Sequence, residues 1–488
     1  MNSVTNEPTE LELKENYSEY IFEFPKKAEK LKLEKNWKQL AEELYNLSDC
    51  FFQLNQYDDL KYIIKIASPF AKKHNKESYY KLKIIEQKVI NDFGEYKKCI
   101  AKLKSLIPKV KSTKLENSIY LLLANSYYQL DEVDISMNYY EKILSNNANF
   151  LQKAQAYNGI GSCYFMNTQL DSAKYYYEKG LETCYRYNCR MHTRVGQILY
   201  NLGLLNEDQG NYKKSKELFE NSLIVYKAKY NESNLKISEV YSSIGTVHLN
   251  TENIESSYNY YIKSYNLIIH YYGKLHPDLI FCYMNLGKLS LQKNDYSKAE
   301  SYLINGLVLS SKQYSKSHNI NIQLYTTLAS IYLKTNNLEK AKKILSEVIA
   351  IESKSKYPSE YLGDAYCILG DCLLKQFNAN KAITYYQKAV ALYDNIYGNK
   401  NVYSIDALIG LSNSYIQIGD FKKALSFAQI ATSYTIKNNQ IIFPYDHWET
   451  QLQALICKKE LYKTKQTNEN AESIIAQIKQ TSLEATKI

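Results

Sequence analysis

The stretch CYMNLGKLSLQKNDYSKAESYLINGL, residues 282–307, places two apolar runs on either side of a short polar segment. Within each run the apolar residues recur at the i, i+3, i+4 and i+7 spacing of an amphipathic helix. Gly287 lies inside the first run, and Ala299 follows twelve residues later in the second. Because a glycine inside a helix costs about 1 kcal/mol relative to alanine, Gly287 needs a compensating reason. We expect that reason to be close packing of two helices.

The arrangement recurs along the chain in four sets of positions that stay in register. Small residues in the first helix recur at intervals of 37, 42, 42, 42, 42, 41 and 42 residues, at Ala124, Gly161, Gly203, Gly245, Gly287, Ala329, Gly370 and Ser412. Twelve residues after each comes a second small residue, at Ser136, Ala173, Ser215, Ser257, Ala299, Ala341, Ala382 and Ala424. An aliphatic residue precedes each member of the first set, at Leu123, Ile160, Leu202, Ile244, Leu286, Leu328, Leu369 and Leu411. A mostly bulky residue follows each member of the second set after four residues, at Tyr140, Tyr177, Phe219, Tyr261, Leu303, Leu345, Tyr386 and Ala428. A period of this length indicates a repeat protein.

The repeat predicts an all-α fold, a right-handed α-solenoid superhelix of about ten helix–turn–helix pairs with essentially no strand. Polar turns such as QKND (292–295) separate the two helices of a pair. Gly287 and Ala299 would let the two backbones approach, with Leu286 and Leu303 filling the space around them. Since one pair cannot bury its apolar face alone, pairs stack and form a long concave surface.

The quality of the repeat divides the chain into four predicted segments. Residues 1–40 are expected to form an N-terminal helical cap, and residues 41–116 two divergent, basic repeats. Residues 117–438 are expected to form eight repeats of 37- to 42-residue period. Residues 439–488 are expected to form C-terminal capping helices, because NNQIIFPYDHW (438–448) breaks the pattern.

Length and composition are typical of a folded cytoplasmic protein. A chain of 488 residues is too long for one globular core. Its start, MNSVTNEPTELELKENYSEY, lacks the basic and apolar segments of a secretory signal. No apolar run approaches the length of a membrane span, and nine scattered cysteines are typical of reduced thiols. We therefore expect a cytoplasmic protein without a transmembrane segment.

The sequence contains no convincing catalytic motif, such as G-x-x-x-x-G-K-[ST], H-E-x-x-H or a G-x-S-x-G in a strand–turn–helix context. Cys184, Cys189 and His192 come nearest to a metal cluster, but structural zinc needs closely paired ligands and four donors. We interpret these residues as inter-repeat packing with a solvated histidine. We interpret His248 as a core histidine, because other repeats have tyrosine in its register. The sequence thus predicts a protein that is not an enzyme and has no cofactor and no metal.

Tyrosine is the compositional outlier, with 49 residues, several of them in doublets such as Tyr139-Tyr140, Tyr260-Tyr261 and Tyr385-Tyr386. Exposed rings could form a platform on which nucleic-acid bases stack. One ring of each doublet, however, follows the packing positions of the repeat. A tyrosine also suits a half-buried site, where the ring is covered and the hydroxyl stays wet. We therefore favour packing for most of them.

Residues 61–114 hold fifteen lysines against four acidic residues, a local charge of +11. A candidate basic docking surface consists of Lys72, Lys73, Lys81, Lys83, Lys97, Lys98, Lys102 and Lys104. These lysines form either a solvated helix face or a docking surface for an acidic partner, anionic lipid or nucleic acid, since clustered charge of one sign steers association. Arginine suits planar phosphate recognition better and is almost absent here. We therefore expect no sequence-specific recognition of nucleic acid.

The pattern resembles the tetratricopeptide repeat. The signature of that family is a large apolar residue, Leu-Gly or Leu-Ala and then Tyr in the first helix, followed by Ala, an aromatic residue and Ala in the second. YNGIGSCYFMNTQLDSAKYYYEKGL (157–181) and YTTLASIYLKTNNLEKAKKILSEVI (325–349) match it. Repeats between residues 196 and 438 resemble the lengthened, 42-residue repeats of kinesin light chains, which also have a His-Pro between repeats, here His276-Pro277.

In this family the first helix of each pair lines the inner face of the superhelix, and partners bind there as extended peptides or short helices. The same register places a set of residues in the groove: Asn125, Tyr128, Asn158, Ser162, Gln197, Tyr200, Asn201, Asn285, Lys288, Lys334, Lys375 and Asn413, together with Asp371 and Gln417. Asparagine recurs, and its amide can both donate to and accept from a peptide backbone.

The resemblance implies a non-enzymatic scaffold or adaptor that binds a peptide or helix of a partner protein. Two alternatives stay open. One is a regulatory sensor that responds to a peptide or small ligand. The other is an electrostatic anchor that uses residues 61–114.

Overall fold

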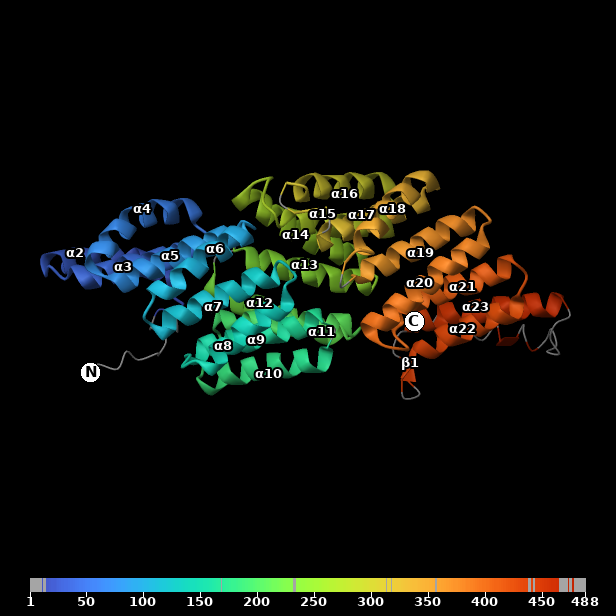
Figure 1. Cartoon of the computed structure of the whole chain (residues 1–488), viewed down its shortest axis with the longest axis horizontal. Coiled ribbons are helices and arrows are strands. Elements are labelled where there is room, and N and C mark those ends of the chain that lie inside the picture. Colours follow the sequence, from blue (N-terminus) through green and yellow to red (C-terminus); the bar gives the residue numbers. More distant parts are fainter. Residues whose placement is uncertain are drawn as a thin grey trace. The chain divides into compact units, whose positions relative to one another are not determined.

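The computed structural model describes residues 11, 15–167, 169–230, 234–312, 314–316, 318–355, 358–437, 440–441, 444–464, 473 and 476–477 (Figure 1). The chain divides into two compact units, Met1–Cys282 (unit 1) and Tyr283–Ile488 (unit 2). Both units consist of consecutive helices that pack in pairs. We call the first helix of each pair helix A and the second helix B.

Unit 1 begins with α2 (Tyr17–Leu33) and continues with helix pairs. The pairs are α3 (Trp37–Gln53) with α4 (Tyr57–His74), α5 (Lys76–Asp92) with α6 (Tyr96–Leu106), α7 (Thr113–Tyr128) with α8 (Val133–Ser145), α9 (Phe150–Met166) with α10 (Leu170–Arg186), α11 (Thr193–Asp208) with α12 (Tyr212–Lys229), and α13 (Leu235–Asn250) with α14 (Ile254–Tyr272). The 3-10 turn η1 (Ile107–Lys109) follows α6.

Unit 2 continues the same arrangement from α15, which spans the boundary between the units. The pairs are α15 (Leu279–Gln292) with α16 (Tyr296–Ser310), α17 (Asn319–Lys334) with α18 (Leu338–Glu352), α19 (Glu360–Lys375) with α20 (Ala379–Tyr397), and α21 (Ile405–Gln417) with α22 (Phe421–Tyr434). The 3-10 turn η2 (Val402–Ser404) precedes α21, and α23 (Pro444–Lys463) packs on α22.

The predicted all-α solenoid is confirmed, since the described residues form ten helix pairs. Their only strands are β1 (Ile436–Lys437) and β2 (Gln440–Ile441), which form a short antiparallel hairpin after the last pair. This hairpin lies where the sequence pattern breaks. The first ten residues of the predicted N-terminal cap and most of the chain after residue 464 lie outside the described residues.

The predicted close approach within each pair is also present. A Cβ atom built on Gly203 would lie 2.5 Å from a ring atom of Phe219, and one on Gly161 would lie 2.7 Å from the ring of Tyr177. For Gly287, the nearest atom would be Cδ2 of Leu303, at 2.8 Å. A bulky side chain of helix B thus lies where a side chain on the glycine of helix A would be. Close packing explains why glycine is retained inside these helices.

Most turns between helix A and helix B share one backbone conformation. One turn residue adopts a left-handed conformation, for example Asn294 at φ 59°, Asn336 at 58° and Gly210 at 73°. Asparagine and glycine tolerate this conformation best. The polar turns of the sequence are therefore compatible with a sharp reversal of the chain after helix A.

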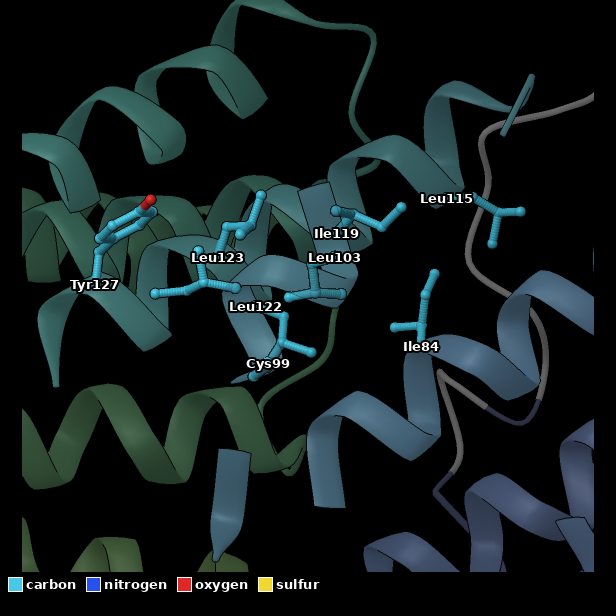
Figure 2. Packing of buried hydrophobic residues seen from close by; sticks show 9 residues of the cluster. Ile84, Cys99, Leu103, Leu115, Ile119, Leu122, Leu123 and Tyr127 are labelled. Atoms are coloured by element: carbon cyan, nitrogen blue, oxygen red, sulfur yellow. The ribbon is translucent and has the colours of Figure 1, made fainter. Parts of the chain in front are cut away.

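Successive pairs share one core. Figure 2 shows Ile84 from α5, Cys99 and Leu103 from α6, and Ile119 and Leu123 from α7 converging between the helices. Cys99, Leu103, Ile119 and Leu123 are fully buried. Because the cluster spans two pairs, neither pair could bury these side chains alone.

The tyrosine doublets are explained by packing. Tyr140, Tyr261 and Tyr386 are almost completely buried. In each of these doublets the preceding ring is covered by a lysine ammonium group, at distances of 4.8 Å for Lys142 over Tyr139, 5.0 Å for Lys263 over Tyr260 and 5.3 Å for Lys388 over Tyr385. Ring faces that are covered in this way do not form a platform for bases.

The nesting of helix pairs predicts opposite effects of alanine at two helical glycines of unit 2. A Cβ on Gly370 would lie 2.6 Å from the ring of Tyr386, whereas one on Gly306 would lie 3.2 Å from the mobile end of Leu324. We expect Gly370→Ala to lower the free energy of unfolding by about 1–3 kcal/mol through overpacking. Gly306→Ala should be neutral or stabilise by up to about 1 kcal/mol through helix propensity. Urea denaturation followed by circular dichroism measures both, and equal effects would contradict the packing account.

Candidate peptide-binding surfaces

The predicted groove residues all lie on helices A, in two sets. Unit 1 holds Asn125, Tyr128, Asn158, Ser162, Gln197, Tyr200 and Asn201, on α7, α9 and α11. Unit 2 holds Asn285, Lys288, Lys334, Lys375 and Asn413, on α15, α17, α19 and α21. We call the surface formed by these positions the inner face of each unit, and we treat the two inner faces separately.

Several of these side chains bind one another across neighbouring helices A. In unit 1, the amide nitrogen of Asn201 donates to the side-chain oxygen of Asn158 at 2.9 Å and to the hydroxyl of Ser162 at 3.4 Å. The hydroxyl of Ser243 donates to that of Tyr200 at 3.0 Å. These bonds connect residues 39 or 43 positions apart, about one repeat. The polar residues of the inner face therefore also hold successive pairs together.

Unit 2 has the same kind of hydrogen bonds between neighbouring helices A, and we call such a series of bonds a ladder. The ammonium group of Lys375 donates to the carbonyl oxygen of Leu333 at 3.1 Å, and the amide of Gln417 donates to that of Leu374 at 3.1 Å. Asn413 accepts from Gln453 on α23 at 2.7 Å. Lys334 and Lys375 remain exposed, and Asn285 and Lys288 are half-buried.

Three carboxylates share the inner face of unit 2. Tyr393 donates to Asp364 at 2.6 Å, and Tyr386 donates to Asp371 at 2.5 Å. Desolvation raises the pKa of Asp364 to about 6, opposed by the bond from Tyr393 and by Lys288. Desolvation also raises the pKa of Asp371 and of Asp406. These carboxylates are short of counter-charge, so a cation placed beside them would be stabilised.

Sequence reasoning placed Asp371 in the groove but missed Asp364 and Asp406. A signal for them was present, because they are 42 residues apart and each lies six residues before a small position of the repeat. The residue in the same register of α17 is Gln323 and that of α13 is Glu239. The earlier helices A have Ser118, Gln155 and Gln197 at this position, so the register is polar in every helix A from α7 to α21 except α15, which has Phe281.

Unit 1 also contains a charged cluster, formed by residues of α4, α5, α13 and the loop before α15. The ammonium group of Lys236 lies 2.9 Å from the carboxylate of Glu239, and the hydroxyl of Tyr57 donates to Asp92 at 3.1 Å. Desolvation, reinforced by Glu239 and Asp92 and opposed by Lys236, raises the pKa of Asp278 to about 7. Desolvation also raises the pKa of Asp92 to about 6, although its side chain still reaches solvent. The cluster brings α4 and α5 next to α13 and the loop before α15.

His192 corrects the interpretation of the cysteine-rich segment. It is buried rather than solvated, and its Nδ1 accepts the backbone N–H of Arg194 at 3.1 Å, which caps α11. Asn234, His276 and His318 cap α13, α15 and α17 in the same way, at intervals of 42 residues. This 42-residue spacing could have predicted the caps from the sequence, but only His276-Pro277 was considered.

The other histidine and cysteine predictions concern packing. Cys184 is fully buried and Cys189 is half-buried. No group of three or more His, Cys, Asp or Glu residues suited to a metal ion occurs among the described residues. His248 stacks on Tyr260 with ring centres 5.6 Å apart, as the packing interpretation predicts, but it is half-buried rather than in the core.

Six of the eight lysines of the basic docking surface are exposed, namely Lys72 and Lys73 on α4 and Lys97, Lys98, Lys102 and Lys104 on α6. Of these six, Lys98 pairs with Glu95 at 2.8 Å. The other two lysines lie on α5 and are also paired with acids. Lys81 lies 3.5 Å from both Glu42 and Glu77, and Lys83 lies 2.6 Å from Glu86. Within the described part of the chain, no helix is long and apolar enough to cross a membrane.

Comparison with known proteins gives the family. Two sequence models of the tetratricopeptide repeat match the chain, one at residues 236–307 and 361–433 and the other at residues 118–150, 196–223 and 322–355. Together with the ten nested helix pairs, these matches show that the chain is a tetratricopeptide repeat protein. No curated protein sequence matches it.

Several solved structures have a similar fold at low sequence identity. NprR in complex with its cognate peptide NprX superposes with a TM-score of 0.50 at 14% identity, over 72% of this chain and 97% of that one. The apo form of the quorum sensor NprR from B. thuringiensis gives 0.49 at 13% identity, over 72% and 100% of the two chains. Kinesin light chain repeats from Podospora anserina give 0.34 at 13% identity, over 42% and 96%. At these identities the likeness concerns the fold.

The raised pKa of Asp278 predicts a pH dependence of stability. Its pKa is about 7 in the folded chain against an ordinary value of 3.8, so folding favours the protonated form. This stability is complete below the ordinary pKa and is lost as the pH rises through about 7. We expect the thermal midpoint of the wild type to be lower near pH 8 than near pH 6, and Asp278→Asn to reduce that difference.

Circular dichroism of both proteins at the two pH values measures this effect. Asparagine is close in size to aspartate and lacks its charge. Burial lowers the pKa of the adjacent His276 to about 4, so that group does not titrate in the same range. An unchanged pH difference in Asp278→Asn would contradict the assignment.

Proposed function

We propose that the protein is a non-enzymatic adaptor that binds a peptide segment of a partner protein on the inner face of unit 2. The observation that supports this proposal most is the alternation of carboxylates and lysines on α15, α17, α19 and α21. Lys288 stabilises the charged form of Asp364, and Lys334 and Lys375 stabilise that of Asp371. For Asp406, burial is not offset by a neighbouring lysine. Tyrosine hydroxyls orient two of the three carboxylates.

This arrangement suits a peptide that carries a basic side chain. The carboxylates lost solvation when the fold formed, and a lysine or arginine of the ligand would replace the missing counter-charge. Asn285 could pair with the peptide backbone, since an amide both donates and accepts. The lysines would accept an acidic residue elsewhere in the same peptide. A segment of mixed charge that contains at least one basic residue is therefore the expected ligand class.

Selection from a random displayed peptide library against the full chain tests the proposal. We expect enriched peptides to carry lysine or arginine and to lose at least about tenfold in affinity for the double variant Asp364→Asn, Asp406→Asn. The control is Glu347→Gln, an exposed acidic position on helix B of the second pair of unit 2, which should leave affinity unchanged. Peptides that bind the double variant as tightly as the wild type would contradict the proposal.

Several inner-face asparagines take part in the ladder of hydrogen bonds between helices A, so their replacement affects structure as well as binding. Asn201→Ala removes bonds that link α11 to α9, so a loss of binding in that variant would mix ligand contact with structural loosening. Asn285→Ala avoids those ladder bonds of unit 1. Asparagine-to-alanine variants alone are therefore a weaker test than the charge variants.

The electrostatic anchor remains a second candidate because six lysines on α4 and α6 are exposed. An acidic partner that docks there should dissociate steeply with added salt. The sensor alternative requires a change in the superhelix on binding. We place the protein in the cytoplasm, a compartment that suits buried, unpaired thiols.

A further inference from the structure

Two described residues that precede α2, Leu11 and Glu15, contact distant parts of unit 1. Leu11 lines a small cavity of about 40 Å³ together with Tyr45, Asn46 and Asp49 of α3 and with side chains from α5 and α7. Tyr45 and Asn46 lie twelve and eleven residues before the start of helix B. Tyr200 and Asn201, two predicted groove residues, have the same spacing to the start of α12. Leu11 thus covers the register that was predicted to bind a ligand.

Glu15, which precedes α2, contacts the first residue of α11, the helix A that begins at Thr193. Its carboxylate accepts the backbone N–H of Thr193 at 2.9 Å and also the hydroxyl of Thr193, 178 residues away in the sequence. Nε2 of His192 lies 3.4 Å from the same carboxylate. Only 3% of Glu15 is exposed, so the carboxylate is enclosed rather than merely nearby. Burial raises the pKa of Glu15, opposed by the two hydrogen bonds from Thr193 and by the charges of Arg194 and Lys229. The two bonds from Thr193, at the start of α11, are therefore what hold the carboxylate in place.

Contacts on either side continue this interface. The ring of Tyr17 stacks on that of Tyr230 at 6.5 Å and 12°. The side-chain amide of Asn234 donates to the backbone carbonyl of Gln53 at 3.1 Å. Glu15 thus contacts the start of α11, and Tyr17 contacts the residue that follows the end of α12.

We propose that Leu11, Glu15 and Tyr17 act as an internal ligand of unit 1, and that a partner peptide with an apolar residue followed four positions later by a carboxylate competes with them for the same surface. The apolar side chain would lie over α3, α5 and α7, and the carboxylate would bind the N–H and hydroxyl of Thr193. A partner can bind only those molecules in which the protein's own residues have left the surface. The apparent affinity for the partner is therefore the intrinsic affinity multiplied by the fraction of such open molecules. The surface differs from the inner face of unit 2, so this proposal and the proposed function can fail independently.

The probe for a test is a fluorescently labelled synthetic peptide with the chain's own sequence PTELELKENYS, residues 8–18. The peptide ends before Tyr20, because the hydroxyl of Tyr20 donates to Glu43. Fluorescence anisotropy measures its binding to the full-length wild type and to the double variant Leu11→Ser, Glu15→Ala. We expect the variant to bind at least about tenfold more tightly, because its own segment competes less well. A peptide in which the residue equivalent to Glu15 is alanine should bind at least about tenfold more weakly than the original peptide.

A matched control is Glu43→Ala. Glu43 is another buried carboxylate, but it pairs with Lys27 at 2.9 Å inside the contact of α2 with α3. Its removal should leave peptide binding at the wild-type level. Tighter binding to Glu43→Ala as well would show that general loosening of the N-terminal pair, rather than release of the segment, admits the peptide, and would overturn the proposal.

Hydrogen–deuterium exchange supplies an independent readout. The amide of Thr193 should exchange faster in the double variant than in the wild type, and added peptide should slow it again, while amides in α8 and α9 stay unchanged. If the double variant does not fold, the conservative variant Glu15→Gln replaces it in both measurements. Equal peptide binding to wild type and variant, or no binding to either, would overturn the proposal.

Discussion

The contact on which the structure depends is a bulky side chain of helix B set against a position on helix A that has almost no side chain. It recurs at Gly161 with Tyr177, at Gly203 with Phe219 and at Gly370 with Tyr386. Glycine is unfavourable in an isolated helix, yet here its lack of a Cβ atom lets two helices approach within the reach of one ring. Where this contact recurs, it gives the pairs a similar geometry. Similar pairs can stack in a regular way, and the stacking exposes one face of every helix A.

That regularity determines what the inner face can do. Once the nested positions are fixed, polar residues at fixed spacings from them on helix A share one face, and their side chains meet at intervals of about one repeat. Asn201 with Asn158 and Ser243 with Tyr200 use this spacing for hydrogen bonds between pairs. Asp364 and Asp406 use it to place charge. One set of positions therefore serves both cohesion and recognition, and a ligand must bind without breaking the bonds that shape its surface.

The sequence predicted the parts of the structure that repeat. The helix pairs, the close approach at Gly287 and the packing of Tyr261 follow from patterns that recur every 37–42 residues. The caps at His192 and His318 and the carboxylates of Asp364 and Asp406 also recur, and a search at 42-residue spacing would have found them. The contact of Glu15 with Thr193 has no periodic signal. It joins residues 178 positions apart, and no local pattern records which distant surface a terminal segment will meet.

A double-mutant cycle at Gly203 and Phe219 tests the nesting contact most directly. Gly203→Ala adds a methyl group where the ring lies, and Phe219→Leu removes the ring atoms that it would meet. The account predicts that the two substitutions together cost less than the sum of their separate effects on the free energy of unfolding, with a coupling of about 1–2 kcal/mol. Additive effects, within about 0.5 kcal/mol, would show that the missing side chain and the ring do not depend on each other, and would contradict the account.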